Sequence, residues 1–194
     1  MFTREEMRKM KKIRCLYNED VSIQAILFLL EKCGGMCDIH KICKMLYYAD
    51  QHSMVTWGRS ITGDAYIAMP YGPVPSNIED AFKGLRDMSY YFSEASYDKL
   101  SKSLSFVNKF TLKALSTPDL DYLSESDIEC LDFAYNKCKD LNFSQLTEMS
   151  HGLAWNEAKK NGEMSTRDIM RETGCSEELI DYVIEEDQIQ LALL

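Results

Sequence analysis

The sequence contains no apolar run long enough to cross a membrane. Its longest, Ala25 to Leu30, is a short hexamer, whereas a helix needs about 20 apolar residues to span a bilayer. The first residues, Met1 to Glu6, lack the apolar stretch of a secretory signal. No internal repeat or low-complexity tract occurs. We therefore expect a cytoplasmic protein.

Positive charge is scarce, with 22 Lys and Arg against 31 Asp and Glu and a net charge of −9. Because phosphate contacts require Lys and Arg, this balance disfavours a nucleic-acid-binding surface. The charge is uneven: residues 1–14 carry six basic side chains, whereas residues 163–194 carry nine acidic ones. The acidic end suits a basic partner, although such runs are usually solvated helix faces.

The seven cysteines form an odd set without a secretory signal, which predicts reduced thiols. Cys33, Cys37, His40 and Cys43 fall close together, and zinc prefers four such ligands in a tetrahedron. However, Cys33 and Cys37 flank a Gly-Gly turn, and structural zinc sites usually divide their ligands between two distant pairs. We interpret these cysteines as helix-packing residues and expect no metal and no cofactor.

Hydrophobic periodicity predicts a compact, mainly α-helical domain with a small antiparallel β-sheet. Helices are predicted over residues 3–14, from Asp20 or Ser22 to Gly34, after Asp38, after Ser76 or Asn77, after Ser124, from Ser144 to His151, around Trp155 with an end at Asn161-Gly162, after Ser165 or Thr166, and after Ser176. Two strands, 65–69 and 105–112, are predicted to pair with each other. We interpret residues 93–103 as a loop or irregular hairpin.

The helix after Asp38 carries an apolar face formed by Ile42, Met45, Leu46 and Ala49. Its adjacent tyrosines, Tyr47 and Tyr48, point in different directions, so we expect at least one at the surface.

Asp50 is predicted to end this helix, where the helix dipole disfavours negative charge. We interpret the carboxylate as an acceptor for the turn at residues 57–59, with Arg59 as its charge partner. The alternative is an exposed Asp50 that contacts a binding partner.

The glycines that follow, Gly58, Gly63 and Gly72, do not have the spacing of a phosphate-binding loop. We expect them to supply backbone positions with positive φ. Pro73 and Pro75 flank Val74 and predict a stiff corner, since each proline fixes its own φ and restricts the residue before it. No nucleophile stands beside a base in residues 41–75.

The order of these motifs resembles the Panacea domain of SocA-like antitoxins. That family shows Leu-x-Tyr-x-Ala-Asp, then Gly-Arg-x-Ile/Leu-Thr-Gly, Tyr-x-Ala and Gly-Pro-Val, and later His followed by Ala-Trp. The matching residues are Leu46, Tyr48, Ala49 and Asp50; Gly58 to Gly63; Tyr66 and Ala68; Gly72 to Val74; and His151 with Ala154 and Trp155. The resemblance covers most of the chain; the segment 52–54 and the tail from Glu163 have no counterpart in the pattern.

The resemblance implies an antitoxin, not an enzyme, that neutralises a cognate toxin by direct binding through a rigid face on residues 57–75. Tyr71 and other aromatic residues near turns are candidate anchors. The residues expected to bind the partner or carry the family motif are Tyr48, Asp50, Trp57, Gly58, Arg59, Gly63, Tyr66, Gly72, Pro73, Val74, His151 and Trp155. We expect a basic segment (1–18), a Panacea-like domain (19–162) and an acidic helical extension (163–194).

Two alternatives remain open at this point. A phage or mobile-element regulatory protein would bind another partner, such as DNA through the basic residues from Arg4 to Arg14. A small Cys/His-dependent enzyme would pair a thiol with His52 or His151, because such residues meet in space and not in sequence.

Overall fold

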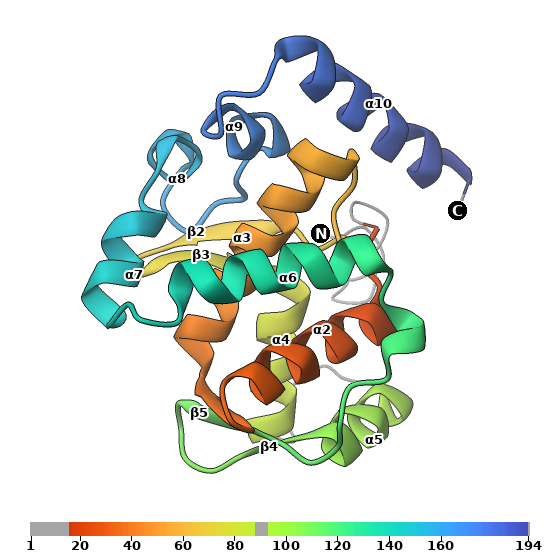
Figure 1. Ribbon diagram of the computed structural model, residues 1–194, viewed down its shortest axis with the longest axis vertical. Coiled ribbons are helices and arrows are strands. Elements are labelled where there is room, and N and C mark those ends of the chain that lie inside the picture. Colours follow the sequence, from red (N-terminus) through yellow and green to blue (C-terminus); the bar gives the residue numbers. More distant parts are fainter. Residues whose placement is uncertain (1–15, 88–92, 194) are drawn as a thin grey trace, which may run out of the picture.

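The computed structural model describes residues 16–87 and 93–193 and confirms a mainly helical fold with small antiparallel sheets (Figure 1). The helices are α2 (Glu19–Lys32), α3 (Ile39–Trp57), α4 (Ser76–Arg86), α5 (Glu94–Ser103), α6 (Glu125–Cys138), α7 (Phe143–Ser150), α8 (Leu153–Glu157), α9 (Thr166–Arg171) and α10 (Glu177–Leu193), with a 3-10 turn at Leu120–Tyr122. The basic helix predicted at 3–14 lies outside the described residues. None of the described helices is long and apolar enough to span a bilayer.

Helix α3 runs through the middle of the molecule, where α6 crosses it and α9 and α10 lie near its C-terminal end (Figure 1). Asp38 begins the helix by accepting a hydrogen bond from the N–H of His40, and Gly58, at φ 72°, ends it. The predicted end at Asp50 is therefore wrong, because the helix continues to Trp57. Both Tyr47 and Tyr48 are buried, with exposed fractions of 1% and 5%. The prediction that one of them reaches the surface is wrong because other elements cover α3 on several sides.

Two separate sheets replace the single predicted one. Strand β1 (Met36–Asp38) pairs with β5 (Thr111–Ala114), which pairs with β4 (Leu104–Phe106). Strands β2 (Tyr66–Met69) and β3 (Gly72–Pro75) form a hairpin of their own. The predicted pairing of 65–69 with 105–112 is therefore wrong. Strand β2 pairs with the next strand of its own hairpin, whereas the 105–112 segment contributes to β4 and β5, which pair with each other and with β1.

The stretch predicted as a stiff corner is strand β3, despite its two prolines. Pro73 lies opposite Ala68, and Pro75 lies opposite Tyr66. An antiparallel ladder uses the N–H of alternate residues only, so two prolines spaced two apart remove no hydrogen bond to β2.

Several helices begin at residues other than those predicted. Asn18, and neither Asp20 nor Ser22, begins α2 by accepting from the N–H of Val21. Asn142 begins α7, two residues before the predicted start, and α8 ends at Glu157. Ser124 begins α6, as predicted, and forms a capping box with Asp127.

The start of α4 depends on a carboxylate from outside the helix. Neither Ser76 nor Asn77 caps it; the side chain of Asp64 accepts hydrogen bonds from the N–H groups of Asn77 and Ile78 at 2.9–3.0 Å. Burial raises the pKa of Asp64 to about 6 although these hydrogen bonds favour the charged form. A cap supplied from twelve residues earlier leaves no local sequence signal.

Residues 94–103 form α5, where a loop was predicted. Ser93 caps it by accepting from the N–H of Ser96. Leu100 is the only buried residue of this helix. The prediction was wrong because so exposed a helix carries almost no apolar periodicity.

The turn at residues 58–63 packs directly against the chain that precedes α2. The N–H of Asn18 donates to the carbonyl of Thr62 at 3.0 Å. Gly63 has φ +64°, and a Cβ there would overlap the carbonyl of Leu16 and lie 2.9 Å from the N of Tyr17. Only glycine fits this close approach of two backbone segments.

Replacing Gly63 with Ala is therefore expected to lower the free energy of unfolding by at least ~3 kcal/mol, since positive φ strain adds to displacement of backbone. Gly34 is the matched control, because it has φ +81° and nothing within 4 Å of its Cβ position. Gly34→Ala should cost only about 1–2 kcal/mol. Urea unfolding followed by circular dichroism measures the free energy of unfolding of both variants. Equal losses would show that the close approach to Leu16 does not add to the cost of the substitution.

Candidate functional site

Asp50 is a buried anchor for the turn that leads into β2. Its carboxylate is fully buried and accepts hydrogen bonds from the N–H groups of Ile61 and Thr62, the hydroxyl of Thr62 at 2.5 Å and the hydroxyl of Tyr66 at 2.7 Å. Four donors satisfy the charge in place of a cation. Asp50 thus binds the turn, as interpreted, but through residues 61–66 and not 57–59.

Arg59, predicted as the partner of Asp50, pairs elsewhere. Its guanidinium donates to Asp127 at 2.8 Å and to the hydroxyls of Ser124 and Ser126. The Asp50–Arg59 pairing is therefore wrong, because the acceptor capacity of Asp50 is already used. Arg59 instead joins the turn to the start of α6.

Glu172 ties the C-terminal helices to α3. Its carboxylate accepts from the hydroxyl of Tyr47, from the side-chain amide of Gln51 at 2.7 Å and from the N–H of Ala154 at 3.1 Å. Gln51 also donates to the carbonyl of Ile169. The sequence offered no signal for this residue, which lies more than 120 positions from two of its partners.

Lys44 is a buried lysine on the side of α3 that faces β3. Its ammonium donates to the carbonyl of Pro73 at 2.8 Å, and its exposed fraction is 0%. Among the residues that the structure describes, no carboxylate forms an ion pair with it. Burial lowers its pKa to about 8. The lysine was overlooked, although its position within the apolar run from Ile42 to Leu46 was a usable signal.

Gly72, at φ +97°, lets β3 approach α3 and α7 closely. A Cβ there would overlap the hydroxyl of Ser150 and lie 3.0 Å from the ammonium of Lys44. No residue with a side chain fits this position unless one of those groups moves. The glycine of the Gly-Pro-Val motif is thus required by packing.

Side chains from two helices hold alternate carbonyls of the β2–β3 hairpin. Trp155 donates its indole N–H to Met69 at 2.9 Å, Lys44 donates to Pro73, and the Nε2 of His40 lies 3.1 Å from the carbonyl of Tyr71. These donors come from α8 and α3. The end of the hairpin is therefore fixed from both sides.

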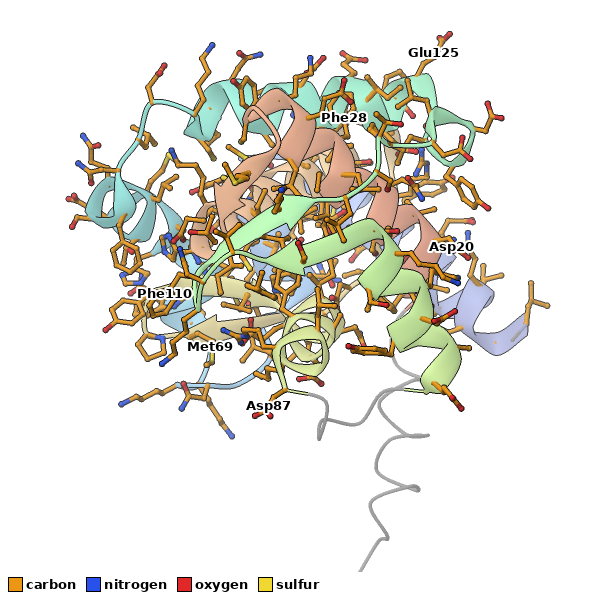
Figure 2. All side chains as sticks on the ribbon, turned by 90° about the horizontal axis from the view of Figure 1, so that it is seen from below. Asp20, Phe28, Met69, Asp87, Phe110 and Glu125 are labelled. Carbon is orange, nitrogen blue, oxygen red and sulfur yellow. The ribbon has the colours of Figure 1, made fainter. Side chains whose placement is uncertain are left out.

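The hairpin presents an aromatic surface to solvent. Met69, Tyr71 and Phe143 are exposed by 36%, 61% and 50%. The ring of Phe143 stacks on His40 at 4.1 Å and meets Tyr71 edge-on at 5.3 Å. We name these three exposed residues the hairpin-tip surface. The β2–β3 hairpin lies beside α7 (Figure 1), and Figure 2 shows Met69 and Phe110 on the same side of the molecule.

The twelve residues predicted for the site do not form one surface. Tyr48, Asp50 and Tyr66 are buried, and the hydroxyl of Tyr48 donates to the carbonyl of Met149. Gly58, Gly63 and Gly72 all have positive φ, as expected. Pro73 and Val74 lie in β3, while His151 and Trp155 stack at 3.6 Å beside the hairpin. Trp57 and Arg59 lie at the far end of α3, about 20 Å from Lys44 at 1.5 Å per residue.

Nothing in the described part of the chain gathers three or more His, Cys, Asp or Glu side chains around a possible metal position. Each of the three histidines stacks on an aromatic ring: His40 on Phe143, His52 on Phe133 and His151 on Trp155.

A groove of about 350 Å³ lies between the 58–66 turn and α10. Its acidic lining includes Glu163, Glu186 and Asp187, and burial raises the pKa of Asp187. Three of the nine acidic residues of the C-terminal segment thus line a concave surface away from the hairpin-tip surface, and Arg59 lines it with them.

Replacing Asp50 with Asn should lower the free energy of unfolding by about 3 kcal/mol. The NH2 group of Asn would face N–H and O–H donors that stay buried and lose their acceptor. Asp140→Asn, at an exposed turn, is the control and should change it by less than about 0.5 kcal/mol. Chemical denaturation measures both, and a loss for Asp50→Asn no larger than that for Asp140→Asn would contradict the anchoring role.

The buried Lys44 should make stability depend on pH. Between pH 8 and 10.5 the unfolded chain keeps the proton that folded Lys44 has lost. Stability should therefore rise with pH in this window by about 1.4 kcal/mol per unit, relative to Lys44→Met, in which the effect is absent. Unfolding of both proteins at pH 7.5, 8.5 and 9.5 gives the difference; a constant difference would mean that Lys44 titrates normally.

No curated protein and no solved structure shows a significant match to the chain. The family described as "Antitoxin SocA-like, Panacea domain" matches residues 42–156, which is more than half of the chain. The matched range includes the Asp50 anchor, the whole hairpin with its Gly-Pro-Val strand, and the stacked His151 and Trp155. The chain therefore belongs to the SocA-like antitoxin family of Panacea domains.

Proposed function

We propose that this protein neutralises a cognate toxin by binding it directly through the hairpin-tip surface. The observation that carries the proposal is the fixed hairpin. Three of its carbonyls are bound by Trp155, His40 and Lys44, while Met69 and Tyr71 point to solvent. A binding surface that is already ordered loses little conformational entropy when its partner arrives.

The mechanism is occlusion. Exposed aromatic side chains near the centre of an interface supply a large part of its binding energy. Tyr71 and Phe143 have this character, and their edge-on contact holds both rings in a defined orientation. A toxin whose active surface is covered by this face cannot reach its own target, and no reaction by the antitoxin is needed.

The acidic groove has a different role in this proposal. Glu163, Glu186 and Asp187 line it beside α10, away from the hairpin-tip surface. Charge of this kind accelerates association with a basic toxin more than it stabilises the complex.

Deletion of residues 163–194 would not test the acidic charge alone, because it would also change the core. It would remove Met170, Ile180 and Val183 from the core, together with the hydrogen bonds of Glu172. Charge reversal at Glu186 and Asp187 leaves the core residues in place and is the better design.

We expect Tyr71→Ala and Phe143→Ala each to weaken toxin binding by about 30-fold, which corresponds to about 2 kcal/mol for an interface anchor. The measurements are titration calorimetry with the product of the neighbouring open reading frame and growth rescue on co-expression. Tyr122→Ala is the matched control, because Tyr122 is an aromatic residue with 49% exposure outside the hairpin.

Three results would contradict parts of the proposal. Binding unchanged in both aromatic variants would reject the hairpin-tip surface. Lost rescue in Glu186→Lys/Asp187→Lys alone would identify the groove as the binding face. A neighbouring product that is harmless when induced alone would reject that protein as the toxin.

A further inference from the structure

The groove beside α10 offers apolar surface as well as charge. It is lined by the chain before α2, by the 58–66 turn and by the C-terminal half of α10. Its apolar lining residues include Val21, Met54, Ile61, Ile169 and Leu191. Met54, Ile61 and Ile169 have exposed fractions of only 5%, 5% and 3%, so they belong to the bottom of the groove. A segment that fills this groove therefore needs apolar side chains of its own.

Three carboxylates line the same groove without a cationic partner. Within residues 16–87 and 93–193, no Lys or Arg forms an ion pair with Glu163, Glu186 or Asp187. Arg59 also lines the groove, but its guanidinium is bound to Asp127 and to two serine hydroxyls. The groove thus presents negative charge that the described residues do not neutralise.

The described chain begins inside this groove. Leu16, the first described residue, is one of its lining residues. Two residues later, the N–H of Asn18 donates to the carbonyl of Thr62 at 3.0 Å, which holds this part of the chain against the 58–66 turn. The point at which the preceding residues join the groove is therefore fixed.

The sequence before Leu16 has the complementary chemistry. Six basic side chains stand there against Glu5 and Glu6: Arg4, Arg8, Lys9, Lys11, Lys12 and Arg14. The apolar residues Met7, Met10 and Ile13 are interspersed among them. An extended chain spans at most about 3.5 Å per residue, so Lys11 lies no more than about 18 Å from Leu16 along the chain. The basic residues are thus close enough to reach the three carboxylates.

We propose that the groove is the docking site of residues 4–14 of the same chain. Their Lys and Arg side chains pair with Glu163, Glu186 and Asp187, while Met10 and Ile13 cover the apolar bottom of the groove. The short connection through Leu16 gives the segment an effective concentration in the mM range. This connection favours the chain's own segment over that of a second copy.

Docking of this segment requires no toxin, so it is independent of the function proposed above. It would neutralise the carboxylates that line the groove and cover its apolar residues. A basic partner would then have to displace the segment before it could occupy the groove. Basic proteins that bind the groove only weakly would be excluded.

Carbodiimide crosslinking of the full-length protein tests the docking directly, because this reagent joins an amine only to a carboxylate in contact with it. Tryptic peptides of the monomer should contain Lys9, Lys11 or Lys12 joined to Glu163, Glu186 or Asp187. Absence of these links, or links only to carboxylates outside the groove, would overturn the proposal. The same links found only in covalent dimers would identify a second copy as the occupant and would also overturn it.

Limited trypsin digestion provides an independent measurement. Glu186→Gln/Asp187→Asn removes two of the three carboxylates and adds no cleavage site. Cleavage after Lys11, Lys12 and Arg14 should become about five- to ten-fold faster, because a released segment is open to the protease.

Glu178→Gln/Glu185→Gln is the matched control for the digestion. It makes the same change of charge on exposed residues of α10 that do not line the groove. Its cleavage rate should equal that of the unmodified protein, and circular dichroism verifies that both variants remain folded. Equal rates in the groove variant and the control would contradict docking in the groove.

Discussion

The arrangement of the domain depends on the burial of one carboxylate, Asp50, among four hydrogen-bond donors. Those donors belong to the turn that joins α3 to β2, so the carboxylate decides where the hairpin begins. The same turn places Gly63 against the chain before α2, and Asp64 at the start of α4. A buried charge without partners is strongly destabilising, so the turn is stabilised in the conformation that brings these donors to Asp50.

Other buried polar side chains along α3 also hold neighbouring segments in place through hydrogen bonds. Its buried polar side chains reach different segments: Lys44 holds β3, Tyr47 and Gln51 hold Glu172, and Tyr48 holds the end of α7. Apolar packing alone tolerates small changes of register, whereas each of these hydrogen bonds is satisfied in one register only. We infer that these hydrogen bonds to α3 fix the position of each segment packed against it. One of these segments is the hairpin that carries the exposed Met69 and Tyr71.

The sequence was informative where structure depends on neighbours and uninformative where it depends on distant partners. The start of α6 at Ser124, the cap at Asp38 and the positive φ of Gly58, Gly63 and Gly72 follow from local chemistry, and all were predicted correctly. The cap of α4 by Asp64 and the hydrogen bonds of Glu172 connect residues that no periodic pattern relates. For the candidate site, the motif located residues 57–75, but neither the pairing of β2 with β3 nor the exposure of their side chains was predicted. Tyr66 and Tyr71 look equivalent in sequence, yet one is buried and the other is mostly exposed.

The contact between Trp155 and the hairpin gives the protein an internal optical reporter. The chain has two tryptophans: Trp57 is half exposed at one end of α3, and Trp155 is sandwiched against His151 with its indole N–H bound to Met69. Since a protonated imidazole quenches an indole that stacks on it, we expect the emission of Trp155 to fall when His151 gains a proton. Burial lowers the pKa of His151, so this change requires a lower pH than the protonation of a free imidazole. The state of the hairpin can thus be followed by fluorescence without attaching a dye.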